Sequence, residues 1–400
     1  MSILHKKTSI PAKQTAVVAL VRCETYDYPD VKRAVDKGLA LLGGMQTFVK
    51  PGERIVLKPN LLAADDPARA VTTHPSVVRA VAEAVRDVTG VQVSAGDSPG
   101  FGSTDAVIGR TGIAAAMREA DIAGADFSTA VDVAFEGIQA RRLSIARGVT
   151  EHDGLISLPK MKTHGFQRFS GAVKNQFGCL PGLIKSELHV KIPGALEFAE
   201  FILDLNACVN PRLYIMDGIV AMEGNGPRGG NPKPMHALLF SNDPIAIDSI
   251  ACMLICLDPE VVPTNSLGAK HGFGVSAIAS IAVRGERLDD MRDRSFKVEH
   301  RPLHPFLSNG VTGTLTRLAV PKPYIRSRGC TKCGTCVAMC PTKPKALSWP
   351  AGVKRGIPRY DYEKCIRCYC CQEICPEHTI YLTRPILRWF VDLVDRIFFR

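Results

Sequence analysis

The sequence lacks the features that mark a membrane-spanning or exported chain. No stretch of eighteen or more consecutive apolar residues occurs, so a spanning helix is not expected. The first residues, MSILHKKTSIPAKQ, contain neither a continuous apolar segment nor a small-residue cleavage site, so export is not expected either. No repeat of solenoid period is present. With 46% hydrophobic residues among 400, the chain can bury one large core or two ordinary ones.

Cysteine is sparse in most of the chain and dense near its C-terminus. Of the 14 cysteines, nine lie between Cys330 and Cys375. The stretches CTKCGTCVAMCP and CIRCYCCQEICP each have the spacing C-x2-C-x2-C-x3-C-P, which is that of bacterial two-cluster ferredoxins. Structural zinc would use four cysteines in two pairs and would leave the prolines unexplained. The pattern therefore indicates metal binding in a reducing cytoplasm and not a disulfide framework.

The region of about sixty residues that contains both motifs resembles the two-cluster [4Fe-4S] ferredoxins. The resemblance implies two clusters, the first of them held by Cys330, Cys333, Cys336 and Cys375. The second is implied to be held by Cys340, Cys365, Cys368 and Cys371. Cys370 does not fit the spacing, and we expect it to be a free thiol. The segment between the two motifs is longer than in the smallest ferredoxins.

The excess of positive over negative charge lies entirely in the last quarter of the chain. Residues 1–300 hold 33 Lys and Arg against 33 Asp and Glu, whereas residues 301–400 hold 17 against 6, which accounts for the whole net charge of +11. Such a basic quarter suits nucleic acid, an anionic membrane or an acidic protein. Negatively charged iron–sulfur clusters supply another reason for it, because nearby cations offset their charge. Nucleic-acid binding is therefore not expected.

The first 300 residues alternate strand-like and helix-like segments. Residues 16–23 form a buried apolar run, and residues 30–44 have a helical pattern closed by glycines. Residues 74–90 carry an early proline, an apolar face of period 3.6 and a terminal glycine, which together predict a helix between two strands. This order predicts an α/β domain with a mostly parallel open sheet and helices on both faces. VDVAFEG and ARRLSIARG are predicted to pair antiparallel.

Polar residues follow the ends of several predicted strands, where open α/β sheets bind their ligands. LPKMKTHG places Lys160, Lys162 and His164 at alternate positions, which share one face of an extended segment. The glycine-rich stretch EGNGPRGG resembles an anion-cradling loop. We expect these residues to share one cleft. Its predicted binding residues are Lys58, Asn60, Asp97, Lys160, Lys162, Asn175, His189, Glu223 and Asn225, and its predicted catalytic residues are His164 and Lys174.

Four stretches in order resemble the domain-of-unknown-function family numbered 362, over roughly residues 50–260. They are VLKPNLLAADDPARAVTTHPSVVRAV, LPKMKTHGFQRFSGAVKNQFG, DGIVAMEGNGP and SNDPIAIDSIA. Members of that family are often joined to a ferredoxin module. The resemblance implies a fold and a shared site, but not a reaction.

HGFQRFSGAVKNQFG is also distantly similar to nickel-pincer lactate racemases. That similarity implies that Lys174 carries the cofactor and that His164 takes part in the chemistry, and His189 falls near a further racemase histidine. His74 stands where the racemases have a substrate-contacting arginine. A racemase also has no need of two electron-carrying clusters.

The leading hypothesis is an iron–sulfur oxidoreductase. Two [4Fe-4S] clusters would pass electrons to a cationic cleft that binds an anionic substrate or cofactor, where cations stabilise developing negative charge. The alternatives are an electron-transfer subunit that docks a partner enzyme and a racemase-like nickel enzyme. The expected partners are a redox protein or ferredoxin-type electron donor and an anionic small molecule. A further metal or organic cofactor in the cleft stays open.

The sequence divides into four predicted parts. They are the α/β domain over residues 1–300, a proline-containing linker over 301–327, a ferredoxin-like α+β domain over 328–384 and a tail over 385–400. As a helix, the tail would have one apolar face and be too short to span a bilayer. It is expected either to dock on the core of the chain or to lie in an anionic membrane surface. The expected location is therefore the cytoplasm, with or without peripheral contact at the inner face of the membrane.

Overall fold

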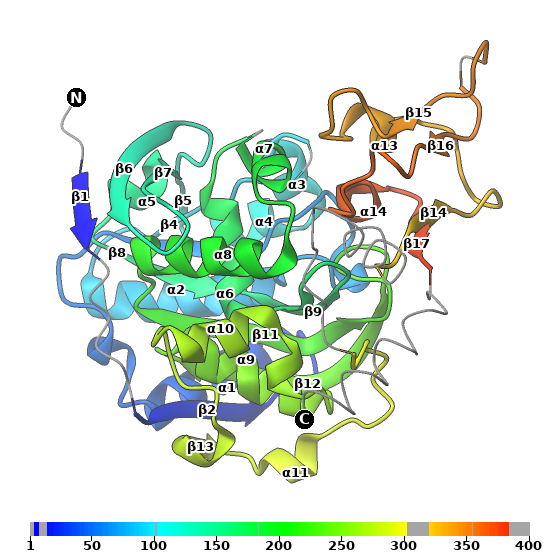
Figure 1. Ribbon diagram of the computed structural model, residues 1–400. Coiled ribbons are helices and arrows are strands. Elements are labelled where there is room, and N and C mark those ends of the chain that lie inside the picture. The colour runs from blue at the N-terminus through cyan, green and yellow to red at the C-terminus, as the bar shows by residue number, and fades with distance from the viewer. Residues whose placement is uncertain are drawn as a thin grey trace.

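The computed structural model describes two packed domains, a large one and a small cysteine-rich one (Figure 1). The described residues are 4–7, 14–100, 102–182, 184–301, 320–353 and 355–383. Within them, no helix has the length and apolar character needed to cross a bilayer. The tail over residues 385–400 lies outside the described residues, so its membrane contact stays a prediction.

The large domain is built on a ten-stranded sheet with the strand order β13-β2-β12-β11-β8-β3-β4-β5, in which β9 also pairs with β11 and β10 pairs with β9. The parallel strands at its centre are β11 (Leu213–Glu223), β8 (Gly154–Leu158), β3 (Ile55–Pro59), β4 (Ser94–Ala95) and β5 (Ala123–Gly124). The long strand β12 (Asn231–Ser241) runs antiparallel to both β11 and β2 (Ala16–Arg22), and β13 (Ile281–Gly285) runs parallel to β2. The predicted, mostly parallel α/β sheet is confirmed.

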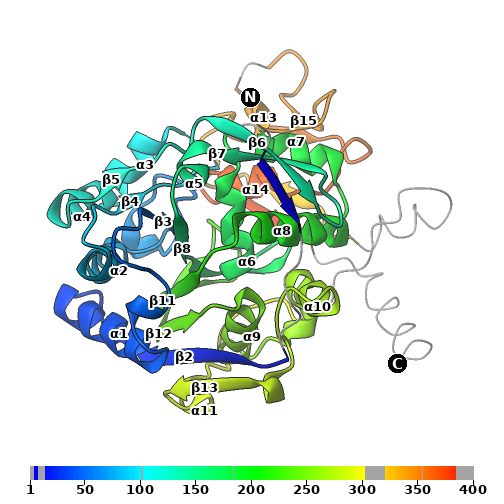
Figure 2. The same cartoon turned by 90° about the vertical axis from the view of Figure 1, so that its left-hand side faces the viewer.

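Helices cover both faces of this sheet, as Figure 2 shows along its edge. On one face α1 (Tyr28–Leu41) and α2 (Pro75–Thr89) pack on the strands, and on the other lie α8 (Ala195–Val209) and α9 (Pro244–Leu254). In β3, Ile55 and Leu57 pack toward α1 and α2, while Val56 packs toward α8. A sheet buried on both faces needs apolar residues at successive positions, which explains the continuous apolar runs of its strands.

Shorter elements complete the large domain. The predicted antiparallel pair is confirmed as β6 (Ala130–Glu136) and β7 (Arg142–Ala146), and β1 (Leu4–Lys7) adds to β6 in parallel. Its other helices include α3 (Thr104–Arg110), α4 (Ile113–Glu119), α5 (Arg147–Thr150), α10 (Pro263–Lys270) and α11 (Leu288–Met291).

The segment that carries most of the predicted site follows β8 directly. It forms β9 (Lys160–His164), β10 (Arg168–Ser170), α6 (Ala172–Asn175) and α7 (Ile184–Lys191). Helix α6 has only one turn, and its N-terminus is held by a buried carboxylate of α9: Asp248 accepts the backbone N–H groups of Ala172 at 2.6 Å and Val173 at 3.1 Å. Burial raises the pKa of Asp248 to about 7, although these N–H groups oppose the shift.

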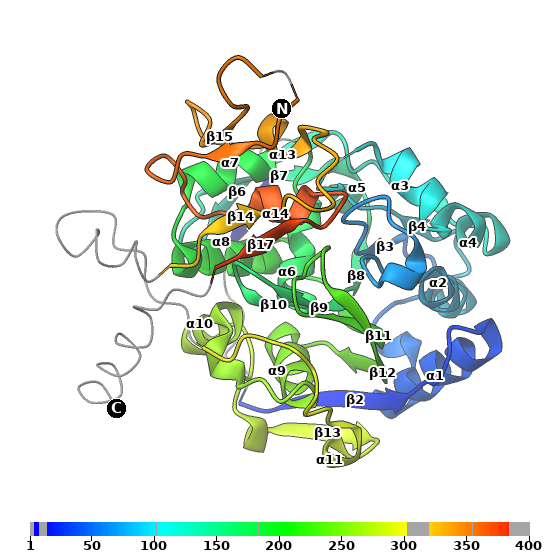
Figure 3. The same cartoon turned by 90° about the vertical axis from the view of Figure 1, so that its right-hand side faces the viewer.

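The small domain contains two pairs of short strands and two short helices. They are β14 (Pro323–Ile325) with β17 (Ile380–Leu382), β15 (Leu347–Ser348) with β16 (Arg359–Tyr360), α13 (Thr335–Ala338) and α14 (Cys370–Ile374). Strand β14 lies within the predicted linker, so the ordered fold of the small domain begins before residue 328. In Figure 1 and Figure 3, α14 and β17 lie next to the large domain, whereas β15 projects away from it.

We expect Asp248→Ala to lower the free energy of unfolding by about 2–4 kcal/mol, because two buried N–H groups lose their acceptor. Urea unfolding followed by circular dichroism measures the change. Asp132→Ala is the control, since Asp132 is exposed on β6, and it should cost less than about 0.5 kcal/mol. An Asp248→Ala protein as stable as the control would show that α6 does not depend on this carboxylate.

Candidate functional site

A cavity of about 110 Å³ lies between the carboxyl ends of the central strands and the small domain. We call it the interdomain cavity. The predicted site residues that line it are Asn60, Asp97, Lys162, His164, Lys174, Asn175 and His189. The small domain contributes Met339, Cys370, Glu373 and Ile374 to the same wall. The cavity therefore joins the end of the parallel sheet to the cysteine motifs.

Two lysines give the interdomain cavity a positive character. Lys162 is 1% exposed, and its Nζ donates to Asn60 Oδ1 at 2.9 Å and to the Val71 carbonyl at 2.8 Å. Lys174 Nζ lies 5.0 Å from the centre of the Phe177 ring. Within the described ranges, neither ammonium has a carboxylate within ion-pair distance. Two such cations in a buried cavity favour the binding of an anion.

Burial makes these two lysines easier to deprotonate. Burial, reinforced by the charges of Lys174 and Lys160, lowers the pKa of Lys162 to about 7. Burial also lowers the pKa of Lys174, although the carboxylate of Glu373 opposes it. A bound anion would reverse part of both shifts, because an opposite charge favours the protonated amine.

Two neutral histidines stand beside the lysines. His164 Nδ1 accepts the backbone N–H groups of Phe166 at 3.0 Å and Gln167 at 3.3 Å, which places the proton of the neutral ring on Nε2. That nitrogen lies 3.2 Å from Glu373 Oε1. His189 stacks on Phe198, and among the described residues its buried Nδ1 has no hydrogen-bond partner.

The protonation states of these groups differ. Burial lowers the pKa of His164 and of His189 to about 4, so both rings are neutral at pH 7. Burial alone would raise the pKa of Glu373, but His164, Lys174 and His189 lower it to about 2. At neutral pH the interdomain cavity thus contains the Glu373 carboxylate, two neutral imidazoles and lysines whose protonation a bound anion would favour.

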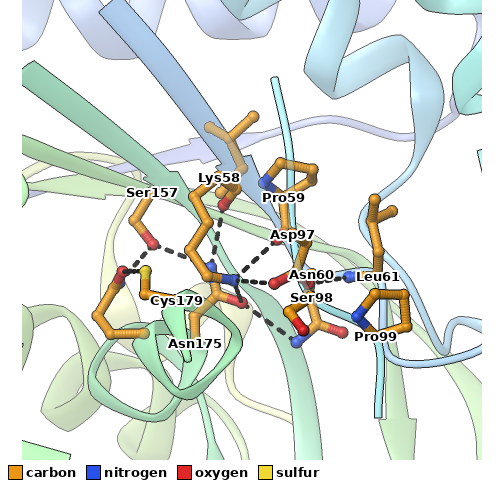
Figure 4. Close-up of polar contacts among 12 residues, drawn as sticks. Lys58, Pro59, Asn60, Leu61, Asp97, Ser98, Pro99, Ser157, Asn175 and Cys179 are labelled. Atoms are coloured by element: carbon orange, nitrogen blue, oxygen red, sulfur yellow. Dashed lines mark hydrogen bonds and ion pairs between the residues drawn. The ribbon is translucent and has the colours of Figure 1, made fainter. Parts of the chain in front are cut away.

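The predicted residue Lys58 lies behind the cavity and not in its lining. Its Nζ lies 2.8 Å from Asp97 Oδ1, and Asn175 donates to the Lys58 carbonyl and to Ser157, contacts that are drawn as dashed lines in Figure 4. Asp97 Oδ2 in turn accepts the Leu61 N–H at 2.7 Å. These contacts fix the ends of β3, β4 and α6 relative to one another, so Lys58 positions Asp97 and Asn175 of the cavity lining.

Lys160 was predicted to bind a ligand in the cleft, but its ammonium pairs with a carboxylate of the protein. Its Nζ lies 2.8 Å from Asp217 Oδ2 and 2.7 Å from the hydroxyl of Tyr26, and it does not line the interdomain cavity. The alternate positions of Lys160 and Lys162 place their side chains on the same face of β9. They do not determine which residues of other strands each side chain meets there. Asp217 is the residue of β11 opposite Lys160, and its carboxylate binds the ammonium.

The glycine-rich loop between β11 and β12 holds the small domain. Asn225 Nδ2 donates to the Ile380 carbonyl at 2.9 Å, and its Oδ1 accepts Gln372 Nε2 at 2.6 Å. Arg228 donates to the Ile374 carbonyl at 2.8 Å. Glu223 accepts the Lys297 N–H at 2.8 Å. The polar side chains of Glu223 and Asn225 are therefore used within the protein, and neither lines the cavity.

The cluster cysteines fall into two groups around two further cavities. The outer cysteine cavity is lined by Cys330, Cys333, Cys336 and Cys375, and the inner cysteine cavity by Cys340, Cys365, Cys368 and Cys371. The resemblance to the two-cluster ferredoxins implied the same two groups of cysteines, one for each cluster. Four thiols around a cavity suit a [4Fe-4S] cube, in which each sulfur binds a different iron. Within the described residues, no three His, Cys, Asp or Glu side chains are placed to hold a single ion.

Sequence reasoning did not identify several residues of the site. Lys185 is buried and donates to the Ser98 carbonyl at 2.6 Å and the Pro99 carbonyl at 2.9 Å, which ties α7 to the loop after β4. Glu373 and Cys370 lie in the second cysteine motif, where only the cluster spacing gave a signal. Their place in the cavity wall results from the docking of the two domains.

Comparison with known families defines the class of this protein. The family model described as domain of unknown function (DUF362) matches residues 55–253, and the model of a 4Fe-4S dicluster domain matches residues 322–376. The chain is 35% identical over 261 residues to the thylakoid-associated protein sll1697 of Synechocystis sp., which covers 65% of this chain and 81% of that protein. The chain therefore belongs to the DUF362 family and carries a 4Fe-4S dicluster domain.

One solved structure resembles the fold only weakly. It is the lactate racemase apoprotein from Thermoanaerobacterium thermosaccharolyticum, with 14% identity and a TM-score of 0.39. The match covers 61% of this chain and 58% of that chain.

We expect anion binding to the interdomain cavity to weaken as the pH rises above about 7. Lys162, with a pKa of about 7, is charged below this pH and loses its proton above it. The other groups around it are Lys160, Lys174, Asp97 and Glu373, and Lys185 has a pKa lowered by burial to about 8. Calorimetric titration with small carboxylates between pH 6 and 9 measures the dependence.

Lys162→Met is the matched variant, because it keeps the length of the side chain and removes its charge. It should bind the anion more weakly at pH 6 and lose the part of the pH dependence centred near 7. A pH profile that is the same in both proteins would rule out Lys162 as the titrating group.

Proposed function

We propose that this chain is an iron–sulfur oxidoreductase, in which two [4Fe-4S] clusters pass electrons to an anionic substrate or cofactor in the interdomain cavity. One observation carries the proposal. Helix α14 contributes Cys371 to the inner cysteine cavity, and Cys370, Glu373 and Ile374 to the interdomain cavity. A ligand in the interdomain cavity would therefore lie against the helix that carries Cys371, one of the four thiols proposed to hold the inner cluster.

Each of the two proposed clusters would supply one electron. Together they would supply the two electrons that a two-electron reduction consumes. The residues of the chain would bind and orient the acceptor. Lys162 and Lys174 attract its negative charge, and the ammonium of Lys174 carries a proton on Nζ at the cavity surface. His189 Nδ1 offers a hydrogen-bonding position that no described residue fills. Because these groups are buried, their charges act on the ligand with little screening by water.

A second candidate is an electron carrier that docks a partner enzyme and turns over no substrate. The exposure of Cys333 supports it, because the outer cluster would then be accessible to another protein. Re-oxidation of the reduced protein by small carboxylates, 2-oxo acids or ketones separates the two candidates. Metal analysis of the same sample tests the racemase-like alternative, which requires nickel.

The anaerobically purified protein should contain about eight irons and eight acid-labile sulfides per chain. Cys333→Ser should lose about four irons, because it removes a thiolate from the outer cysteine cavity. Cys370→Ser should keep about eight, since Cys370 lines the interdomain cavity instead. Iron and sulfide assays measure both. If Cys370→Ser loses half of its iron, Cys370 is a cluster ligand and this assignment is wrong.

Lys174→Ala should slow the substrate-dependent re-oxidation of the reduced clusters by about a hundredfold, because it removes one of the two cavity lysines that have no carboxylate within ion-pair distance among the described residues. Its iron content should be that of the unchanged protein. Lys191→Ala is the control, since Lys191 is an exposed lysine of α7. The rates follow from cluster absorbance after dithionite reduction and addition of the candidate acceptor. A Lys174→Ala protein with the rate of the control would remove Lys174 from the proposed site.

A further inference from the structure

The inner cysteine cavity has a buried cation beside it. Arg367 lies between Cys365 and Cys368 in the second motif and is 5% exposed. Its Nε and Nη1 are buried, and in the part of the chain that the structure describes neither has a hydrogen-bond partner. The centre of its guanidinium lies 5.1 Å from the ring centre of Tyr362. A buried arginine whose N–H donors are unpaired lowers the stability of the fold, unless a negatively charged group binds next to it.

Two aromatic rings connect the guanidinium to the inner cysteine cavity. The Tyr362 ring beside Arg367 stacks on Tyr360, whose hydroxyl donates to Cys371 Sγ at 3.3 Å. Arg367 is thus placed to stabilise negative charge on the sulfurs of the inner cysteine cavity.

The hydroxyl groups around the two cysteine cavities are balanced and do not distinguish them. At the outer cavity, Thr335 lies 3.3 Å from the sulfur of Cys333, and Thr379 lies 3.5 Å from that of Cys375. At the inner cavity, Tyr360 donates to Cys371 at 3.3 Å, and Thr342 lies 3.4 Å from the sulfur of Cys340.

The cations do differ between the two cavities. Among the described residues, the cation that lines the outer cavity is Lys332, which is exposed, and Glu377 lines the same cavity with the opposite charge. Water screens an exposed charge, whereas a buried guanidinium acts on its neighbours at low effective dielectric. Solvent near the exposed Cys333 also favours negative charge on the outer cluster, but through dipoles and not through a fixed charge.

We propose that Arg367 raises the reduction potential of the inner cluster above that of the outer cluster, so that electrons collect beside the interdomain cavity. This inference rests on the proposed function in one respect, namely that both cysteine cavities hold clusters. A one-electron reduction adds one negative charge to a cluster, and a buried positive charge beside it stabilises the reduced form. Arg367 would thereby direct electrons from the outer cluster toward the substrate.

The first test uses the full-length protein without any substrate. Clusters are reduced at a series of fixed potentials and the reduced forms are quantified by electron paramagnetic resonance. Two separate steps are expected. Tyr360→Phe identifies the inner cluster, because it removes the hydroxyl donor to Cys371 and should move the step of higher potential downward. Reduction of both clusters at one potential, or a Tyr360→Phe effect on the step of lower potential, overturns the inference.

The second test removes the charge. In Arg367→Gln, the ratio of reduced to oxidised inner cluster at the original midpoint should fall about tenfold or more, equivalent to about 59 mV for one electron. In Arg367→Lys, which keeps the positive charge, this ratio should fall less. Lys332→Gln is the matched control at the outer cavity and should change the outer cluster less than about twofold. Equal effects of Arg367→Gln and Arg367→Lys, or an equally large effect of Lys332→Gln, overturn the role of the Arg367 charge.

Iron content separates this inference from the proposed function. Wild-type protein without iron contradicts both. Shifted potentials in a protein that reduces no acceptor support the inference and contradict the proposed function. If Arg367→Gln loses its inner cluster, the measurement on the wild type and Tyr360→Phe still decides the order of the two potentials.

Discussion

The structure depends on the docking of one short helix, α14, against the end of the parallel sheet. Asn225 accepts from Gln372 and donates to Ile380, and Arg228 donates to Ile374, so the glycine-rich loop holds α14 of the second cysteine motif and strand β17 after it. Without this contact the interdomain cavity would lose the wall that Cys370 and Glu373 provide. The geometry that relates the cysteines to the lysines is thus fixed by a few polar contacts to backbone carbonyls.

Electrostatics give the interdomain cavity its chemistry. Several cations are buried near the sheet end, but most of them already have partners: Lys58 with Asp97, Lys160 with Asp217, and Lys185 with two carbonyls. Lys162 and Lys174 are left without a carboxylate in the described part of the chain. Buried charges of this kind shift toward neutrality until a ligand of opposite charge arrives, so ligand binding and proton uptake are coupled.

Some of this arrangement was predictable because it follows from local periodicity. The alternation of strands and helices predicted the mostly parallel sheet, which the structure confirms, and the pair β6 and β7 was predicted from two short apolar stretches. Other expectations depended on neighbours that the sequence does not show. Lys160 was expected in the same cleft as Lys162, yet its ammonium pairs with Asp217, the residue opposite it on β11. Asn225 was expected to bind an anion, yet it binds the small domain.

The sequence by itself determined the fold class, the family and the presence of a 4Fe-4S dicluster domain, because these depend on spacing and period along the chain. Tertiary structure alone decided which polar side chains face the interdomain cavity. It placed Cys370 and Glu373, some two hundred residues from Lys162 and Lys174, in the same wall. The reason is physical: a side chain that has a partner is unavailable to a ligand, and its partners come from segments that folding brings together.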